Sequence, residues 1–505
     1  MPYRETNFST RPSVQAASIV AMESNALRFR GLCAAVQPSV PPFWKSNIQN
    51  SRLGGGSQKS EFAKVKTSGP SLPTYDHPFH FPPAKSEVPP PVNRMPVEIL
   101  GEIFAQFLQL GDFETEFDAF SLSVSPEWVA SPMVLGQVCG YWRSIALSMP
   151  SLWCSISVSS PARGVVPIMQ IWLERARQHP LKLFVEQSVR PGTAEEAVTN
   201  EIFALLLQHY HHWEHITFRV HGRITESLAN IRDAPCPLLT SALLDMWWDD
   251  DVPVVDRIWS VLHSSPKLSH VDWNDVYAHT IQLPTHIPWH QLEDVALSHY
   301  FDINEFCTFL QQCSRLEKLQ VSWIDRPGFS PEPCTPILLT HLRHLSICAR
   351  TSLDPVFNRL VTPALTSMIL KYKNPTKESR GLSEFGNLLR RSSCTLKLFK
   401  VYLESVDFLN FLLHSSQQLN YVEDLYARTT IPYEVIAALT LDSNNKFQLL
   451  PRLKKLKLAG CLSPEGITKM ISSRLPPHIK KSKMEALTSV SVEIDADALP
   501  MYRTI

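Results

Sequence analysis

The fold of this chain is indicated by a short pattern whose fullest copy is Leu453-Lys454-Lys455-Leu456-Lys457-Leu458-Ala459-Gly460-Cys461. In this pattern a leucine is followed by two variable residues, an apolar residue, one variable residue and a second apolar residue. Apolar residues that alternate with variable ones are typical of a strand that buries one face. Further good copies are Leu268-Val271-Trp273, Leu292-Val295-Leu297, Leu316-Leu319-Val321, Leu342-Leu345-Ile347, Leu365-Met368-Leu370, Leu396-Phe399-Val401 and Leu487-Val490-Val492.

The spacing of these copies indicates a repeat. The leading leucines at 268, 292, 316, 342 and 365 are separated by 24, 24, 26 and 23 residues. That period is typical of leucine-rich repeats, in which each repeat contributes one strand and one helix. Two weaker copies and a damaged one extend the series: Trp213-Ile216-Phe218, Leu239-Ala242-Leu244 and Leu419-Val422-Asp424.

The segments between the copies have helical apolar faces, as Phe306, Phe309, Leu310 and Cys313 show in the segment 302–316. Cys461 stands where such repeats favour Asn or Cys, but Tyr300, Ile324 and Arg350 occupy the equivalent place elsewhere. We therefore predict an α/β fold over 165–500, an irregular leucine-rich-repeat solenoid with parallel strands on its concave face. Such a face suits recognition of another protein. The alternative is a general α/β domain with alternating strands and helices.

A different region, 94–157, contains two amphipathic helical patterns. Pro96 suits the first turn of a helix, and the apolar stripe that follows is Ile99, Leu100, Ile103, Phe104, Phe107 and Leu108. Ser131-Pro132 is a second start signal, followed by the stripe Val134, Leu135, Val138, Cys139, Trp142, Ile145 and Ala146. Two such helices cannot fully cover each other, so they need a further apolar surface. That surface belongs either to a partner or to a larger core that they cap.

The order of residues in this region resembles the F-box. The signature is Met95-Pro96-x-Glu98-Ile99-Leu100, then Leu135-x-x-Val138-Cys139-x-x-Trp142-Arg143-x-Ile145-Ala146, then Leu152-Trp153. It is most similar to F-box proteins abundant in mushroom-forming fungi, where degenerate leucine-rich repeats often follow. The resemblance implies a short all-α module that docks on the Skp-type adaptor of a cullin–RING ubiquitin ligase. The implied adaptor-facing residues are Met95, Pro96, Ile99, Leu100, Ile103, Phe104, Leu135, Val138, Cys139, Trp142, Arg143, Leu152 and Trp153.

The function implied is that of a non-catalytic subunit of a Skp–cullin–F-box ligase, which holds an unknown target protein while another subunit transfers ubiquitin. Trp142, Leu135 and Ile99 would be central to the adaptor contact. No cofactor is implied, and no Gly-rich phosphate loop, GxSxG elbow or HExxH helix occurs. The alternative is an interaction scaffold without a ligase, in which the helical pair only caps the repeats.

Two segments stand outside these domains. Residues 1–93 contain Gly54-Gly55-Gly56, many serines and a proline-dense run from Pro70 to Pro91. This composition predicts a disordered tether, although Arg4, Arg11, Arg28 and Arg30 leave a transit peptide as an alternative. Residues 111–130 make the loop between the two helices longer than a compact F-box needs, an insertion that costs little stability.

Composition limits the remaining possibilities. The 48 basic and 48 acidic residues cancel, so overall charge favours neither nucleic acid nor an anionic membrane. No apolar run is long enough to span a bilayer. The ten cysteines are scattered without a CxxC pair, which favours free thiols in a reducing compartment, the cytoplasm or nucleus.

Three polar clusters could carry other functions. His211 and His215, with His209 and His212 nearby, could share a helix face as metal ligands, but Trp213 and Ile216 instead predict a strand start there. Asp245 and Asp249–251 beside Trp247 and Trp248 could bind a cation or a basic peptide. Lys480, Lys481 and Lys483 form a small basic cluster, more typical of solvated surface than of a nucleic-acid site. The sequence predicts no bound metal.

Overall fold

The computed structural model describes residues 94–109, 132–188, 190–221, 225–228, 230–247, 252–273, 283–326, 335–372, 383–402, 408–441, 449–461, 466–476 and 485–494. The N-terminal region 1–93, the stretch 111–130 and the lysine cluster at 480–483 lie outside these residues. The chain divides into two compact units. The helical unit contains most of α2 (Val97–Gln109) with α3 and α4 (Pro132–Val138 and Gly140–Ser148), and the sheet unit contains the chain from Met149 onward.

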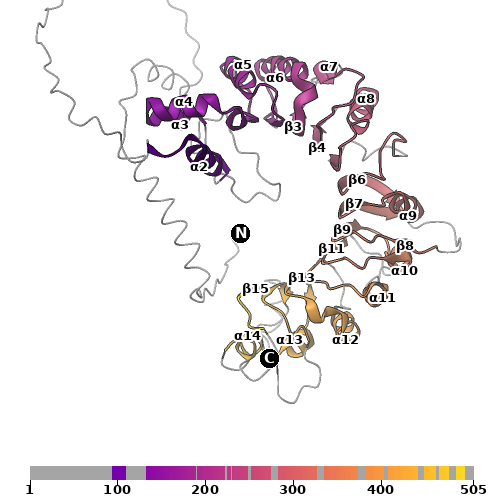
Figure 1. The fold of residues 1–505 in the computed structure, drawn as a ribbon. Coiled ribbons are helices and arrows are strands. Elements are labelled where there is room, and N and C mark those ends of the chain that lie inside the picture. Colours follow the sequence, from indigo (N-terminus) through magenta and orange to yellow (C-terminus); the bar gives the residue numbers. More distant parts are fainter. Residues whose placement is uncertain are drawn as a thin grey trace, which may run out of the picture. The chain divides into compact units, whose positions relative to one another are not determined.

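Thirteen strands of the sheet unit form one sheet (Figure 1) in which every pairing is parallel and the spatial order follows the chain. They are β1 (Ser155–Ser159), β2 (Leu181–Glu186), β3 (Trp213–His221), β4 (Ser241–Trp247), β5 (His270–Trp273), β6 (Asp294–Asp302), β7 (Lys318–Arg326), β9 (His344–Ala349), β11 (Ser367–Tyr372), β12 (Leu398–Tyr402), β13 (Asp424–Ile431), β14 (Lys455–Cys461) and β15 (Ser489–Ile494). A separate parallel pair joins β8 (Ile337–Leu338) to β10 (Leu360–Val361).

Helices connect the strands and pack against one side of the sheet (Figure 1). They are α5 (Val165–Ala176), α6 (Thr193–Leu206), α7 (Thr225–Leu228), α8 (Val252–His263), α9 (Ile303–Gln312), α10 (Asp354–Arg359), α11 (Ser383–Ser392), α12 (Phe408–His414), α13 (Tyr433–Leu439) and α14 (Ile467–Ser473). Short 3-10 helices are η4 (Pro150–Trp153), η5 (Leu207–His212) and η6 (Gln418–Tyr421). The predicted α/β alternation of parallel strands with helices is therefore confirmed.

The repeated apolar pattern forms the core between the sheet and the helices. In β7, Leu319 and Val321 are each 1% exposed, as is the leading Leu316, while Lys318 and Gln320 between them are exposed. Phe306 and Phe309 of α9 supply the helical side of this layer and are also buried. The repeats from β3 to β14 bury the same three positions, whereas the last copy buries Leu487 and leaves Val490 and Val492 half-buried. This burial is the main favourable term that holds the sheet and the helices together.

One predicted copy has the wrong register. The sheet aligns Phe399 with Leu425 and Val401 with Ala427. The copy that forms β13 is therefore Val422-Leu425-Ala427 and not the predicted Leu419-Val422-Asp424. All three of these residues are 0% exposed. Asp424 instead lies on the opposite face, and Leu419 belongs to η6.

The first two strands were not predicted. The sheet aligns Ile156 with Leu183 and Leu183 with Ile216, so Trp153-Ile156-Val158 is a further copy with the spacing of Trp213-Ile216-Phe218. Trp153 packs edge-on against Trp172 of α5, with ring centroids 5.4 Å apart. The predicted helical domain 94–157 thus ends inside β1, and the predicted repeat domain 165–500 begins after it.

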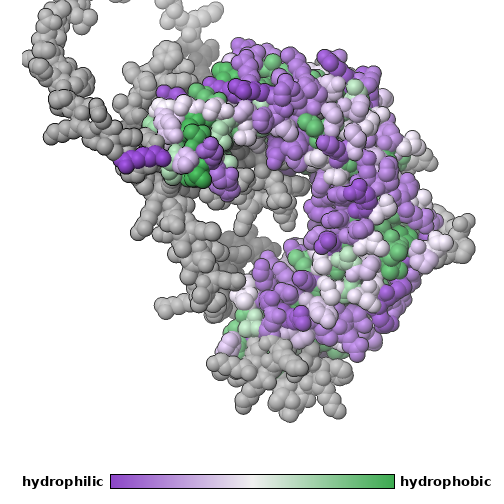
Figure 2. All heavy atoms as spheres, in the orientation of Figure 1, coloured by the Kyte–Doolittle hydropathy of each residue, from purple (hydrophilic) through white to green (hydrophobic). Residues whose placement is uncertain are grey.

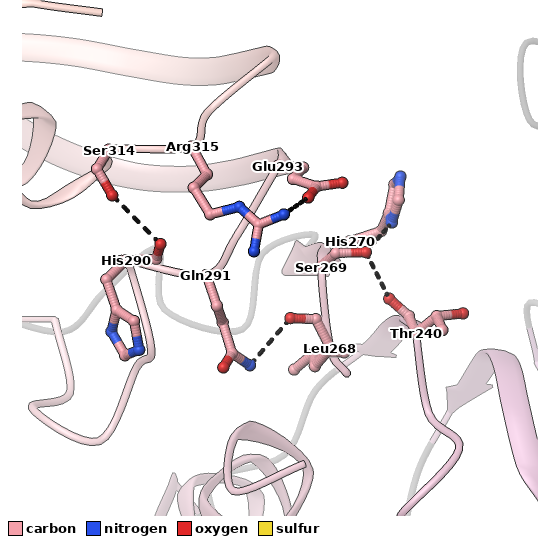
Figure 3. A network of polar contacts seen from close by, with 9 residues as sticks. All are labelled: Thr240, Leu268, Ser269, His270, His290, Gln291, Glu293, Ser314 and Arg315. Carbon is pink, nitrogen blue, oxygen red and sulfur yellow. Dashed lines mark hydrogen bonds and ion pairs between the residues drawn. The ribbon is translucent and has the colours of Figure 1, made fainter. Parts of the chain in front are cut away.

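A backbone hydrogen-bond ladder joins successive repeats before their strands begin. At each step one carbonyl accepts two consecutive N–H groups of the next repeat; for example, the Ser269 carbonyl accepts from Glu293 at 2.8 Å and from Asp294 at 3.1 Å. The carbonyls that act in this way belong to Thr240, Ser269, Glu293, Glu317, Arg343, Thr366, Lys397, Glu423 and Lys454. Side chains reinforce the ladder around Ser269 (Figure 3), where Gln291 Nε2 donates to the Leu268 carbonyl and Arg315 pairs with Glu293. The ladder keeps the strands from β4 to β15 in phase.

Two arginines, of which Arg474 is buried and Arg391 is exposed, tie neighbouring helices together at their carboxyl ends. Arg474 is 1% exposed and donates to the carbonyls of Leu439, Leu450 and Leu449 at 2.8, 3.0 and 2.7 Å. Leu439 is the last residue of α13, where a positive charge is favourable. Burial lowers the pKa of Arg474 to about 10, so the guanidinium stays charged at neutral pH. Arg391 makes the same kind of contact with the carbonyls of Phe357 and Leu360 at the end of α10.

We predict that Arg474→Leu lowers the free energy of unfolding by about 3 kcal/mol, because three buried carbonyls lose their donor. Urea unfolding followed by circular dichroism measures this difference. Lys469→Leu, at an exposed position of α14, is the matched control and should change the free energy by less than about 0.5 kcal/mol. Equal effects of the two substitutions would contradict the stabilising role of Arg474.

Candidate interaction surfaces

The helical unit has an apolar core formed where α2 meets α4. The rings of Phe104 and Trp142 lie with centroids 4.9 Å apart. Leu100 and Phe104 are 0% exposed, and Leu135 and Trp142 are 3% and 5% exposed. The Tyr141 hydroxyl, 3.4 Å from the Met95 carbonyl, also joins α4 to the residues that precede α2. These side chains hold the helices of the unit together.

The other side of α2 remains open to solvent. Val97 is 44% exposed and Ile99 is 52% exposed, whereas Leu100, one residue further and about 100° around the helix, is buried. Pro96 is also exposed, and Met95 and Ile103 are half-buried. The broad predicted stripe of α2 is therefore divided into an inner part and an outer part.

The second predicted helix is interrupted at Cys139. α3 ends at Val138 and α4 begins at Gly140. The Cys139 sulfur accepts a hydrogen bond from the Trp142 N–H at 3.4 Å, which satisfies a donor of the first turn of α4. Arg143 Nε donates to the Gly136 carbonyl at 2.7 Å and joins the two helices across the break. Cys139 and Arg143 thus have structural partners inside the unit.

The structure sorts the thirteen predicted adaptor-facing residues into three groups. Buried are Leu100, Phe104, Leu135, Trp142, Leu152 and Trp153; half-buried are Met95, Ile103, Val138 and Cys139; exposed are Pro96, Ile99 and Arg143. Leu152 and Trp153 lie in η4 of the sheet unit. Sequence reasoning missed Val97, Met133 and Leu147, which are 44%, 39% and 43% exposed. Figure 2 shows apolar surface over the helical unit.

The second candidate surface is the face of the sheet opposite the buried leucines. On β4 to β6 this face is acidic, with Asp245, Asp272 and Asp294 on neighbouring strands. Burial, together with the charges of Asp245 and Asp294, raises the pKa of Asp272 to about 7, although Arg219 and Lys318 oppose the shift. Lys318 also pairs with Asp294 at 3.2 Å. On β11 to β14 the same face carries lysines and tyrosines.

The candidate histidine cluster does not form one helix face, because β3 begins at Trp213, where the sequence predicted a strand start. His211 lies in η5, whereas His215 lies in β3 with its Nδ1 3.4 Å from the Thr240 hydroxyl. His212 is buried and bonds Gln178 at 2.7 Å. In the part of the chain that the structure describes, no group of three His, Cys, Asp or Glu residues could hold a metal ion. Trp248 and Asp249–251 fall outside that part, and only the backbone of Trp247 is described.

Comparison with known proteins supplies no further assignment. A scan against protein-family models found no family that matches the chain, and a search of curated proteins found no similar one. None of the described helices combines the length and the apolar character that a bilayer crossing requires. The eight cysteines within the described residues form no disulfide with one another, and six of them are buried.

We predict that Asp272→Asn stabilises the protein at pH 8 but not at pH 4. The folded-state pKa of Asp272 lies above its unfolded value, so the folded protein loses stability as pH rises from about 4 to about 7. The neutral amide of asparagine avoids this loss of stability. At pH 8 the gain in unfolding free energy is about 2 kcal/mol after allowance for partial exposure to solvent. Unfolding free energies of both proteins at the two pH values measure the effect. A gain of the same size at pH 4 would contradict this origin.

Proposed function

We propose that this protein is the substrate-recognition subunit of a Skp–cullin–F-box ubiquitin ligase. In this proposal the helical unit binds a Skp-type adaptor and the sheet unit binds a target protein. The observation that carries it is the outward apolar side of an F-box-like helix: Val97 and Ile99 are solvent-exposed next to the Met95-Pro96 start. The protein itself would be non-catalytic and would raise the local concentration of the target near the ubiquitin-charged enzyme.

The distribution of exposed apolar side chains supports docking by the helical unit. Of the nine large apolar side chains that are exposed in the described residues, four belong to this small unit: Val97, Ile99, Met133 and Leu147. Single exposed apolar residues are common on protein surfaces, but a concentration of them is typical of an interface. The buried pair Phe104 and Trp142 would keep the helices in place, so that the outer residues meet the adaptor in a fixed arrangement.

The sheet unit supports the second half of the proposal. We interpret its repeats as irregular leucine-rich repeats. Helices are about 10 Å wide and strands are spaced about 4.8 Å apart, so a single layer of helices on one side bends such a sheet and leaves the strands on the concave face. A concave face made by many strands offers the large, extended surface that protein recognition needs. Cysteines that form no disulfide with one another suit a protein of the cytoplasm or nucleus, where thiols stay reduced.

The test is a double substitution of exposed residues, Val97→Ser with Ile99→Ser. We expect binding to a purified Skp-type adaptor to weaken at least about tenfold, because the contact loses about 1 kcal/mol or more of apolar burial from each side chain. Size-exclusion chromatography and isothermal titration calorimetry measure the interaction. The thermal melt should stay unchanged, since neither residue belongs to the core of the unit.

The matched control is Ile171→Ser with Leu338→Ser, which removes two exposed apolar side chains, 44% and 61% exposed, from the sheet unit. This variant should bind the adaptor as the unsubstituted protein does. If the unsubstituted protein fails to bind the adaptor, the ligase assignment is wrong and a repeat scaffold capped by helices is favoured. If both double variants bind equally well, the adaptor does not use the outer side of α2.

A further inference from the structure

Two short rows of side chains cross the open face of the sheet in its C-terminal half. Each row has a cation, a tyrosine and a cation on three successive strands. The register of the strands fixes the rows as Lys400–Tyr426–Lys457 and Lys371–Tyr402–Arg428. We call them the lysine–tyrosine rows. Because residues two apart on a strand share a face, the two rows lie side by side on the same surface.

Contacts between the rows make the two tyrosines a joint platform. The rings of Tyr402 and Tyr426 have centroids 4.9 Å apart and are inclined by 58°. Lys371 Nζ lies 5.6 Å from the centre of the Tyr402 ring, and Lys457 Nζ lies 5.4 Å from the centre of the Tyr426 ring. These distances suit cation–π attraction, which holds the long lysine side chains close to the rings.

The described residues of this surface carry a net positive charge, although the whole chain is neutral. Lys455 of β14 adds a fifth cation beside the rows. Within the described parts of β11 to β15, the acidic residues on this face are Asp424 and Glu493. Glu493 pairs with Lys457 at 3.2 Å. Lys371, Arg428, Lys455 and Lys457 are solvent-exposed and Lys400 is half-buried. A local positive excess on an accessible face attracts an anionic partner and fixes its orientation.

We propose that the lysine–tyrosine rows bind an acidic, extended segment of the target protein, with carboxylates three residues apart. The inference rests on the proposed function, since it names the class of target segment that the sheet unit holds. The two cations of one row lie two strand spacings apart, about 9.6 Å. A segment extended as a polyproline II helix has three residues per turn and rises about 9.3 Å in that turn, so side chains three residues apart point to the same side. A segment that crosses the strands can therefore place one glutamate or aspartate at each cation, with its intervening residues over the tyrosines.

The geometry favours a peptide over a single-stranded nucleic acid, the other ligand that mixed basic and aromatic surfaces bind. Base stacking needs an open ring face, but a lysine lies over each tyrosine ring and the rings are steeply inclined to each other. Asp424 and Glu493 would also repel a continuous phosphate backbone. A peptide with carboxylates at every third residue brings fewer charges near these acids than a backbone with one phosphate at every nucleotide does.

The experiment measures binding of fluorescein-labelled peptides to the full chain by anisotropy. One peptide has glutamate at every third position among serine and alanine, and a second has the same composition with its glutamates in one block. We expect the first to bind at least about tenfold more tightly than the second, and its affinity to fall as salt is raised. Equal binding of the two peptides, or no binding of the first, would overturn the proposal.

Substitutions locate the site. Lys400→Glu with Arg428→Glu takes one cation from each row and should weaken binding of the first peptide at least about tenfold. Lys400→Gln with Arg428→Gln removes the same two charges without reversing them, and it replaces the first variant if that variant does not fold. This second variant should weaken binding of the first peptide about threefold or more. Lys182→Glu reverses an exposed cation of the same face on β2 and should leave binding unchanged. Peptide binding that survives both double substitutions would overturn the proposal.

Two further measurements separate the alternatives. A single-stranded oligonucleotide of similar charge that competes more strongly than the first peptide would overturn the peptide assignment. Adaptor binding, measured on the Lys400→Glu, Arg428→Glu variant, should be unaffected because the rows lie outside the helical unit. Loss of peptide binding alone thus reports on the rows, whereas failure of the unsubstituted protein to bind the adaptor reports on the ligase proposal.

Discussion

The sheet depends on one backbone carbonyl in each repeat. From Thr240 to Lys454, the carbonyl that precedes a strand accepts two consecutive N–H groups of the next repeat. This contact fixes where each strand starts relative to its neighbour. Once the starts are aligned, the two-residue period of a strand decides which side chains enter the core and which face the solvent. A slip of one residue at a single carbonyl would send a buried leucine to the surface and an exposed lysine or aspartate into the core.

The alignment explains both what could be predicted and where prediction failed. Leu316, Leu319 and Val321 were identified because each must be apolar to reach the helices, and a spacing of three and then two residues suits a turn that enters a strand. The same logic was ambiguous at Leu419, Val422 and Leu425, which are apolar at every third position. The register that begins with leucine is damaged by Asp424, and the intact register begins with Val422 instead of leucine. The pairing of Phe399 with Leu425 shows that the sheet uses the second register. The copy that begins at Trp153 was not predicted for a related reason: Leu152 and Trp153 also matched the end of the helical motif.

In the helical unit the sequence predicted the apolar residues of the helices but not which of them are buried. Ile99 and Leu100 both belong to a broad apolar stripe, and their sequence does not say which of them faces α4. The answer depends on where Trp142 lies, a long-range contact that periodicity does not contain. The break at Cys139 was equally hidden, since α3 and α4 continue one apolar pattern across it. The pattern correctly predicted that these helices are amphipathic. Which side of its helix is buried depends on how the helices pack against one another, and the pattern does not contain this information.

The carbonyl ladder also has a consequence for how such a chain can change in evolution. Its accepting residues are separated by as few as 23 residues, from Arg343 to Thr366, and by as many as 31, from Thr366 to Lys397. Each repeat is therefore aligned with its neighbour at one fixed place, while the number of residues between successive places varies. Unequal crossing-over that duplicates or deletes a segment between two accepting carbonyls leaves the remaining ones in phase. A gene of this kind can gain or lose whole repeats without disturbing the rest, and the charged residues on its open face can diversify one repeat at a time.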